Sequence, residues 1–284
     1  MPELPEVETI VLDLKEKIIG KTIKDVWTDT PNIIKKPKNF SLFKKEIIGR
    51  RIEKIFRKGK NIVFVLSGNY FLLTHLKMTG HFLFGKWTFN EKRWVSQKEG
   101  PLNDPMNLFI RVVFFFEDGF MLSLSDLRKF AKMELSKEEP DFRLLGPDIF
   151  EISFDNFFEK IKNQKGKIKQ VLMNQELVSG IGNIYADEIL WKSKIHPFKK
   201  ADSLSKEEIK LIFKFSQEIL KLSLKLKGDS MSDYRRVDGS KGEFQKEHKV
   251  YRRTGKNCFA CKEKIERIKI GGRSAHFCPN CQIL

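Results

Sequence analysis

The first clear pattern of apolar positions along the chain spans residues 5–19. Apolar side chains recur there every three or four positions, which places them on one face of a helix. These side chains are Val7, Ile10, Val11, Leu14 and Ile18. Pro5 suits the first turn of a helix, and the carboxylates of Glu6 and Glu8 complement the positive end of its dipole. We therefore predict an amphipathic helix at the start of the chain.

Segments rich in Ile, Val and Phe dominate the next hundred residues, and turn signals separate them. The segments are residues 21–28, 46–57, 61–67, 70–76, 110–117 and 120–125. Ser67-Gly68-Asn69 and Asp118-Gly119 favour turns between neighbouring segments. This alternation of strands and turns predicts a mainly antiparallel β-sandwich.

The pattern becomes helical after a connecting segment at residues 136–150. The helical segments are residues 153–163, 166–174, 182–193 and 205–226. Residues 228–247 are polar and charged and contain glycines, which is typical of a mobile loop. We predict an α+β chain whose domains span residues 1–140, 150–247 and 248–284.

Composition excludes several classes of protein. The chain has 284 residues, of which 40% are hydrophobic, and no apolar run approaches the roughly 18 residues of a membrane helix. Its start, MPELPEVETI, is acidic and lacks the basic region of a secretory signal. A membrane protein, a secreted disulfide scaffold and a disordered chain are therefore not expected, and we expect a cytoplasmic protein.

Charge is distributed unevenly along the chain, whose formal net charge is +17. Residues 1–159 carry 26 basic and 23 acidic side chains, a net charge of +3, whereas residues 160–284 carry 28 and 14, a net charge of +14. A lysine-rich composition or a solvated face could also make a chain basic. The uneven excess favours a polyanionic partner, and nucleic acid is the first candidate.

All four cysteines lie in the last 27 residues, in the pattern C-x2-C-x16-C-x2-C. They are Cys258, Cys261, Cys278 and Cys281. Two close pairs can present four thiolates to one tetrahedral zinc ion, and the alternatives are two disulfides or four free thiols. The residues between the pairs read as a hairpin turning at Gly271-Gly272, with Arg273 just past its tip. We predict a zinc ribbon with a structural role.

The first three residues, Met1-Pro2-Glu3, suggest covalent chemistry. A small second residue permits removal of Met1, which would leave Pro2 with a free secondary amine. An α-amino group has a pKa of roughly 8, against about 10.4 for lysine, so more of it is neutral and nucleophilic at pH 7. Glu3 could shuttle protons beside it. The alternative is that Pro2 merely precedes a helix.

Five separated motifs settle that choice by resemblance. They are MPELPEVET at the start, RKGKNIVF around Lys60, HLKMTG from His75 to Gly80, LVSGIGNIYADEIL at residues 177–190, and GGRSAHFCPNC in the cysteine hairpin. In this order they resemble the formamidopyrimidine-DNA glycosylase / endonuclease VIII family over essentially the whole chain. The resemblance implies a β-sandwich flanked by helices, a helix–two-turn–helix domain and a zinc finger.

The same resemblance implies base excision repair of double-stranded DNA by a monomer that contacts no membrane. Pro2 would attack C1′ of the damaged nucleotide and form a Schiff base, and Glu3 would donate and accept protons. The imine acidifies the C2′ hydrogen, so the 3′ and then the 5′ phosphate can be eliminated. Glu6 matches a supporting carboxylate of the family, although an acidic residue in a first helical turn is also simply a good cap.

Further residues match family contacts to DNA. Lys60 and Arg273 match phosphate-binding groups that also serve as proton donors, Arg273 in the second elimination. His75, Lys169 and Asn183 match DNA-binding positions, with the glycines before Asn183 opening a helix N-terminus to a phosphate. The alternatives are a solvated turn lysine at position 60 and a plain helix cap at position 183.

Three side chains indicate the lesion. Met78, Arg128 and Phe130 match the residues that the purine-repair branch inserts into the gap left by an extruded base, although a single Met or Phe is more often part of a core. This arrangement favours 8-oxoguanine and formamidopyrimidines as substrates. The alternatives are an endonuclease VIII-like enzyme for oxidised pyrimidines and a silent binder of damaged DNA.

Four residues depart from the family pattern. Lys77 stands where glycine is usual, and Leu127, Lys129 and Ala131 stand where Pro, Arg and Gly are common. They flank the gap-filling residues, so they bear on excision efficiency and on the choice of opposite base rather than on the covalent chemistry.

Overall fold

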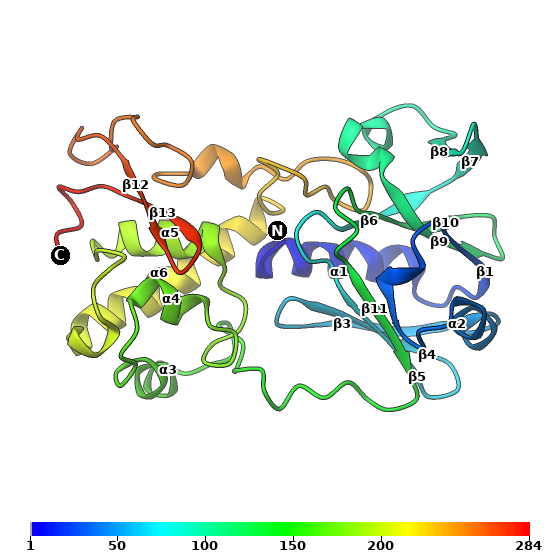
Figure 1. Cartoon of the computed structure of the whole chain (residues 1–284), viewed down its shortest axis with the longest axis horizontal. Coiled ribbons are helices and arrows are strands. Elements are labelled where there is room, and N and C mark those ends of the chain that lie inside the picture. The colour runs from blue at the N-terminus through cyan, green and yellow to red at the C-terminus, as the bar shows by residue number, and fades with distance from the viewer. Residues whose placement is uncertain (1) are drawn as a thin grey trace. The chain divides into compact units, whose positions relative to one another are not determined.

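The computed structural model describes residues 2–284 and divides them into two compact units (Figure 1). The first unit contains the chain up to Asp141 together with residues 226–243, and the second contains residues 142–225 and 244–284. The predicted domains put residues 226–243 with the helical region, whereas these residues contact the first unit.

Helix α1, Leu4–Ile18, confirms the predicted amphipathic helix. The five apolar side chains of the predicted stripe are at most 1% exposed and belong to the core of the first unit. The helix ends after Ile18, because Ile19 adopts an extended conformation. The burial of a complete apolar face is what fixes α1 against the strands.

Two sheets make up most of the first unit. One sheet has the order β1-β9-β10-β6 and the other the order β2-β11-β5-β4-β3. Their strands are β1 Ile23–Thr28, β2 Ile34–Lys36, β3 Ile52–Lys58, β4 Asn61–Leu66, β5 Tyr70–His75, β6 His81–Gly85, β9 Ile110–Phe116, β10 Met121–Ser125 and β11 Lys132–Ser136. Every pairing is antiparallel except that of β2 with β11. The rings of Phe64 and Phe82, one from each sheet, meet edge to face with centroids 5.7 Å apart, so the sheets share one core. The predicted sandwich is confirmed.

The predicted strand at residues 46–57 begins too early. Residues Phe40–Ile47 form helix α2, whose N-cap Asn39 accepts a hydrogen bond from the backbone N–H of Leu42 at 3.0 Å. Phe43 and Ile47 are fully buried, so Ile47, which the predicted strand included, belongs to the buried face of a helix. Strand β3 starts only after this helix ends.

A hairpin of β7, Trp87–Asn90, and β8, Arg93–Ser96, also lies outside the predicted strands. The rings of Trp27, Phe89 and Trp94 cluster there with centroids 5.0–5.5 Å apart. Short 3-10 turns adjoin it and other connections of the unit: η1 Pro31–Ile33, η2 Pro101–Asn103 and η3 Pro105–Leu108. The hairpin gives the first sheet a second, smaller apolar cluster on its other side.

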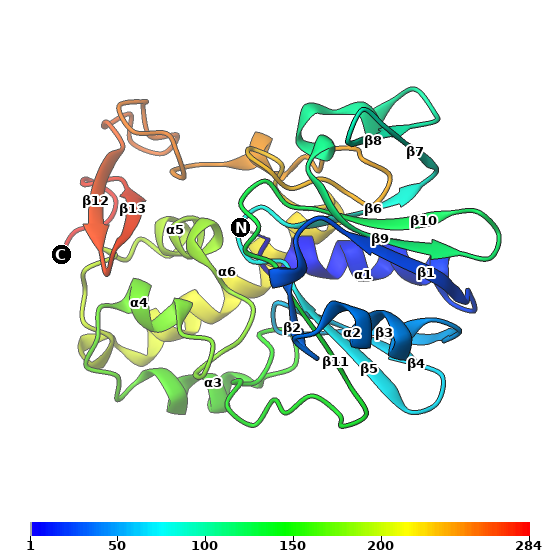
Figure 2. The same cartoon turned by 45° about the vertical axis from the view of Figure 1, so that its right-hand side comes forward.

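The second unit contains the predicted helices and the cysteine hairpin. Its elements are α3 Phe154–Ile161, α4 Ile168–Met173, α5 Asn183–Lys192, η4 Ala201–Ser203, α6 Lys206–Lys225, η5 Phe244–Glu247, β12 Glu266–Ile270 and β13 Arg273–Phe277. Strand β13 packs on α5 (Figure 2). Gly271 and Gly272 have φ angles of +53° and +75°, as the predicted hairpin turn requires. The α+β fold class is confirmed, and no helix within residues 2–284 is long and apolar enough to cross a membrane.

Candidate functional site

The N-terminal site consists of Pro2, Glu3 and Glu6 at the beginning of α1. Pro2 is buried, and Glu3 and Glu6 are 2% and 1% exposed. The Glu6 carboxylate accepts hydrogen bonds from the backbone N–H of Glu3 at 2.7 Å and of Asp229 at 2.9 Å. Glu6 therefore does more than complement the helix dipole, because it joins the N-terminal residues to the segment that returns at Asp229. The expected removal of Met1 concerns a residue outside the described part of the chain.

The returning segment, residues 226–243, lacks helices and strands but makes specific contacts within the first unit. Arg236 pairs with Asp13 of α1 at 3.0 Å, and Arg235 pairs with Asp104 at 3.0 Å. Gly228 has a φ angle of +86°, and a Cβ there would press against the Glu6 side chain. The sequence suggested only a mobile loop, since nothing local reveals partners so distant along the chain.

Lys60 lies in the turn between β3 and β4 and is 7% exposed. His75 ends β5, directly opposite Asn61 of β4. The pKa of His75 is lowered to about 4, chiefly because burial disfavours the imidazolium and also because Lys77, Lys60 and Lys132 repel it. A neutral imidazole therefore stands within the field of Lys60.

The tautomer of His75 follows from its hydrogen bond. Its Nδ1 accepts a hydrogen bond from the backbone N–H of Lys77, with Nδ1 and Lys77 N 2.9 Å apart. Nε2 therefore carries the ring hydrogen and can donate it to an anion. Lys77 has a φ angle of +55°, a left-handed conformation that favours glycine. This geometry explains why a glycine is usual at that position and why Lys77 is a strained exception.

Met78, Arg128 and Phe130 come together from two loops and form what we call the exposed triplet. The Arg128 guanidinium lies 2.9 Å from Met78 Sδ and 4.6 Å from the centroid of the Phe130 ring. Phe130 is 49% exposed, so the core alternative fails for this residue. The arrangement leaves an apolar and cationic group open to a partner.

Asp126 holds the loop of the exposed triplet, and the sequence analysis missed it. Its carboxylate accepts hydrogen bonds from the Thr79 hydroxyl, from Arg128 N at 3.2 Å and from Ala131 N at 2.8 Å. Asp126 is fully buried. The Ser-Asp start of the loop was a signal for such side chain-to-backbone bonding.

Asn183 is the first residue of α5, and the N-cap is Gly182. Asn183 therefore does not cap the helix, which excludes the alternative that it is a plain helix cap. Its Oδ1 atom is buried and has no hydrogen-bond partner among residues 2–284. The start of α5 thus places the Asn183 side chain at the positive end of the helix dipole, where an anion is favoured.

Lys169 is placed differently from the expected DNA contact. It is 1% exposed, and its Nζ lies 2.6 Å from Asp187 Oδ1 and 2.5 Å from the Ser274 carbonyl. The chain itself thus binds this ammonium group, whereas a phosphate contact needs an accessible one. Arg273, by contrast, is exposed at the start of β13.

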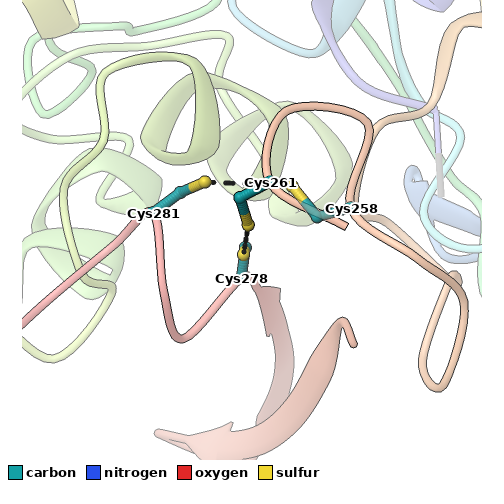
Figure 3. A group of neighbouring side chains, drawn as sticks. All are labelled: Cys258, Cys261, Cys278 and Cys281. Carbon is teal, nitrogen blue, oxygen red and sulfur yellow. Dashed lines mark hydrogen bonds between the residues drawn. The ribbon is translucent and has the colours of Figure 1, made fainter. Parts of the chain in front are cut away.

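The four cysteines converge on one point (Figure 3). Their sulfur atoms all lie within 4.8 Å of one another, and two cross-pairs, Cys258–Cys281 and Cys261–Cys278, are 3.9 and 3.4 Å apart. A disulfide needs about 2.05 Å, whereas four thiolates around zinc stand about 3.8 Å apart. The cluster is a site for one structural zinc ion, and the disulfide alternative does not fit.

Two adjacent carboxylates of α5 anchor the zinc module, and the sequence analysis missed both. Asp187 accepts hydrogen bonds from His276 of β13. Glu188 is 3% exposed and accepts from the backbone N–H groups of Lys249, Val250 and Tyr251 at 2.8–3.0 Å. No local pattern distinguishes these residues from helix-surface acids.

Comparison with known proteins follows the same division of the chain. Residues 1–133 match the formamidopyrimidine-DNA glycosylase N-terminal domain, residues 145–235 match the helix–two-turn–helix (H2TH) domain of that enzyme, and residues 255–283 match the zinc finger found in FPG and IleRS. The formamidopyrimidine-DNA glycosylase of Mycoplasma mobile is 39% identical over all of both chains. That of Oceanobacillus iheyensis is 37% identical over 99% of this chain and 98% of its own.

Solved structures agree over the full length. Lactococcus lactis Fpg bound to DNA with an abasic site has a TM-score of 0.85 and 34% identity, with both chains covered completely. MutM bound to DNA containing carbocyclic 8-oxo-G has a TM-score of 0.86 at the same identity and coverage. Since the family domains and full-length relatives cover this chain, it belongs to the formamidopyrimidine-DNA glycosylase family.

Proposed function

We propose that the chain is a bifunctional glycosylase and abasic-site lyase that removes oxidised purines from duplex DNA. The observation that carries this proposal is the N-terminal site of Pro2, Glu3 and Glu6 in a chain of this family. Glu6 fixes the backbone of Glu3 through a hydrogen bond, so the two groups that the chemistry needs share one rigid helix start.

The covalent step begins when the free amine of Pro2 attacks C1′ of the damaged nucleotide. The N–C1′ bond forms as the glycosidic bond breaks, and the base leaves with a proton. The C1′–O4′ bond then opens, Glu3 supplies the proton to O4′, and an imine remains on Pro2. Loss of a C2′ proton expels the 3′ phosphate, and a second elimination expels the 5′ phosphate.

The DNA backbone is held by groups from both units. Lys60, Asn183 and Arg273 contact phosphates, and Lys60 and Arg273 also donate protons. His75 joins them as a neutral donor, because burial keeps its imidazole uncharged and Nδ1 is already engaged. Phosphate contacts of this kind set the register of DNA without reading its sequence.

The exposed triplet supports purine specificity. Met78, Arg128 and Phe130 form one apolar and cationic wedge, which can occupy the gap left by an extruded base. Similar structures hold DNA with 8-oxo-G or Fapy-dG. A structure of Lactococcus lactis Fpg with an oxidised pyrimidine in DNA also exists, so the lesion range calls for direct comparison.

The two parts of the chain have different roles in this function. Residues up to Asp141 with 226–243 carry the covalent chemistry, and the helical region and zinc finger add phosphate contacts. The protein acts as a monomer on DNA in the cytoplasm.

Borohydride trapping tests the proposal. Duplexes that carry one 8-oxoguanine, one oxidised pyrimidine or one abasic site are incubated with the protein and reduced. A covalent adduct that forms fastest on the oxidised purine among the damaged bases is expected. A preference for the pyrimidine would indicate the endonuclease VIII-like enzyme. Binding without any adduct would leave only a silent binder.

A further inference from the structure

A buried carboxylate in the second unit joins three elements. Asp187 lies on α5, one helical turn after Asn183, and is 1% exposed. Its Oδ1 accepts from Lys169 Nζ of α4 at 2.6 Å, and its Oδ2 accepts from His276 Nδ1 of β13 at 2.9 Å and from His276 N at 3.0 Å. We call Lys169, Asp187 and His276 the Asp187 network. A buried charge persists only where partners satisfy it, and here α4 and β13 supply them.

The Asp187 network closes the outer edge of the hairpin. His276 pairs with Arg267 and Ser274 with Lys269 across β12–β13. The N–H of His276 and the carbonyl of Ser274 leave β13 on the side away from β12. Asp187 accepts the first group and Lys169 donates to the second, at 3.0 and 2.5 Å. The ion pair therefore takes the place that a third strand would occupy.

A second contact fixes the tip of the hairpin against α4. Gly271 has a φ angle of +53°, and a Cβ at this position would clash with the side-chain amide of Gln170, the residue after Lys169. The hairpin tip thus lies against the Gln170 side chain of α4. Arg273 lies two residues after Gly271 and directly before Ser274, so contacts with α4 flank it on both sides.

The zinc site alone does not produce this alignment. Its ligands lie at the base of the hairpin, two before β12 and two after β13, whereas Arg273 begins β13 beside the tip. Zinc can shape the ribbon, but the direction of the hairpin relative to α5 comes from the contacts along β13. Those contacts converge on Asp187.

We infer that Asp187, Lys169 and His276 are positioning residues, which align the exposed Arg273 with the Asn183 end of α5 so that both grip one DNA backbone. This inference rests on the proposed phosphate contacts of Arg273 and Asn183. It gives Lys169 a role in DNA binding that is compatible with its burial, because the lysine acts through the hairpin rather than on a phosphate. It also explains why a helix carries two adjacent buried carboxylates, Asp187 for the hairpin and Glu188 for the segment leading to the zinc site.

A double-mutant cycle tests the inference. The dissociation constant is measured for a duplex with a tetrahydrofuran abasic analogue, using wild type, Asp187→Asn, Arg273→Ala and the double variant. We expect about tenfold weaker binding for Asp187→Asn and little further loss when it is added to Arg273→Ala. The dependence of log Kd on log salt should fall by about 0.9 in both single variants, since each loses one phosphate contact.

The controls separate alignment from general damage. Zinc content must remain one ion per chain in every variant. Asp155→Asn makes the same change of charge at an exposed position of the same unit, on α3, and should bind as wild type does. His276→Phe should reproduce the loss, whereas His276→Asn, which keeps a donor near the position of Nδ1, should restore most of it. The two His276 variants still test the inference if Asp187→Asn does not fold, because both keep the Asp187 carboxylate that pairs with Lys169.

The outcomes distinguish this inference from the proposed function. Additive losses from Asp187→Asn and Arg273→Ala, or equal binding by His276→Phe and wild type, would overturn the positioning role while leaving the contact of Arg273 intact. Unchanged affinity and salt dependence in Arg273→Ala alone would instead remove the proposed phosphate contact, and the inference would fall with it.

Discussion

The two units hold their functional side chains by different means. In the first unit the N-terminal site stands on α1, whose apolar face is buried in the core that both sheets share. In the second unit buried carboxylates tie short helices to the zinc hairpin. Their charges differ as well: the first unit carries 29 basic and 23 acidic side chains, a net of +6, and the second 25 and 14, a net of +11.

This difference teaches where each unit is vulnerable. Hydrophobic burial is non-directional and tolerates the loss of a single polar contact, so the first unit should keep its fold when its reactive groups are altered. Polar networks and metal sites depend on every member, so the second unit should lose its alignment when one partner is removed.

The largest effect is expected at Pro2. A preparation that keeps Met1 has the Pro2 nitrogen in an amide, so it should bind damaged DNA but neither form a borohydride adduct nor cleave the strand. Mass spectrometry establishes the N-terminus, and gel analysis measures cleavage. Normal cleavage by a fully Met1-retaining preparation would exclude the Pro2 mechanism.

Zinc removal should affect the second unit and leave the first folded. Cys261→Ser removes one of the four ligands, and chelation removes the metal itself. Zinc contributes about 10–16 kcal/mol to the folding of small zinc modules, so DNA affinity and lesion cleavage should both fall by more than about a hundredfold. Hydrogen exchange should show loss of protection in β12 and β13 but not in β4, β9 and β10. Loss of protection throughout would mean that the two units do not differ in this way, and active protein without zinc would refute the metal site.

The stability of the first unit should depend on pH through His75. Its folded pKa of about 4 lies below the unfolded value of about 6.5, so only the unfolded chain takes up this proton as the pH falls. The stabilisation is fully present above about pH 6.5 and decreases toward pH 4, by about 3 kcal/mol in all. His75→Gln removes the titration, so the wild type should lose that much more of its free energy of unfolding than the variant does. Urea unfolding at several pH values measures this, and parallel pH profiles would contradict it.

The exposed triplet should give the smallest effect and the most selective one. Phe130→Ala or Arg128→Ala should slow excision of 8-oxoguanine from duplex DNA by about tenfold, since a base-sized wedge is lost. Nicking of a preformed abasic site should change less, because no intact damaged base has to be extruded. Val95→Ala, at an exposed apolar position of the same unit, serves as the control. Equal losses on both substrates would show that the two residues merely support the fold.

Local patterns allowed much of the architecture to be predicted. The stripe of α1, the run of strands and the four long helical segments all follow periodicities of two or three to four residues, which depend only on neighbours in the chain. The exceptions have the same cause. The predicted strand at residues 46–57 included the last two residues of α2, because Ile47 fits either period. Strands β2, β6, β7, β8 and β11 were not predicted, because each spans only three to five residues.

The chemistry of the candidate site divides in the same way. The reactive terminus Pro2-Glu3, the cysteine spacing and the Gly-rich approach to Asn183 are local, and the sequence by itself determined them. Glu6 meets Asp229 across 223 positions, Asp187 meets His276 across 89, and Lys169 meets Ser274 across 105. Only the tertiary structure decided those partners, because a carboxylate or an ammonium group carries no information about which distant hydrogen-bonding groups the folding of the chain will bring to it. For that reason Lys169 could be placed in the DNA-binding region from its motif, while its burial behind the hairpin could not.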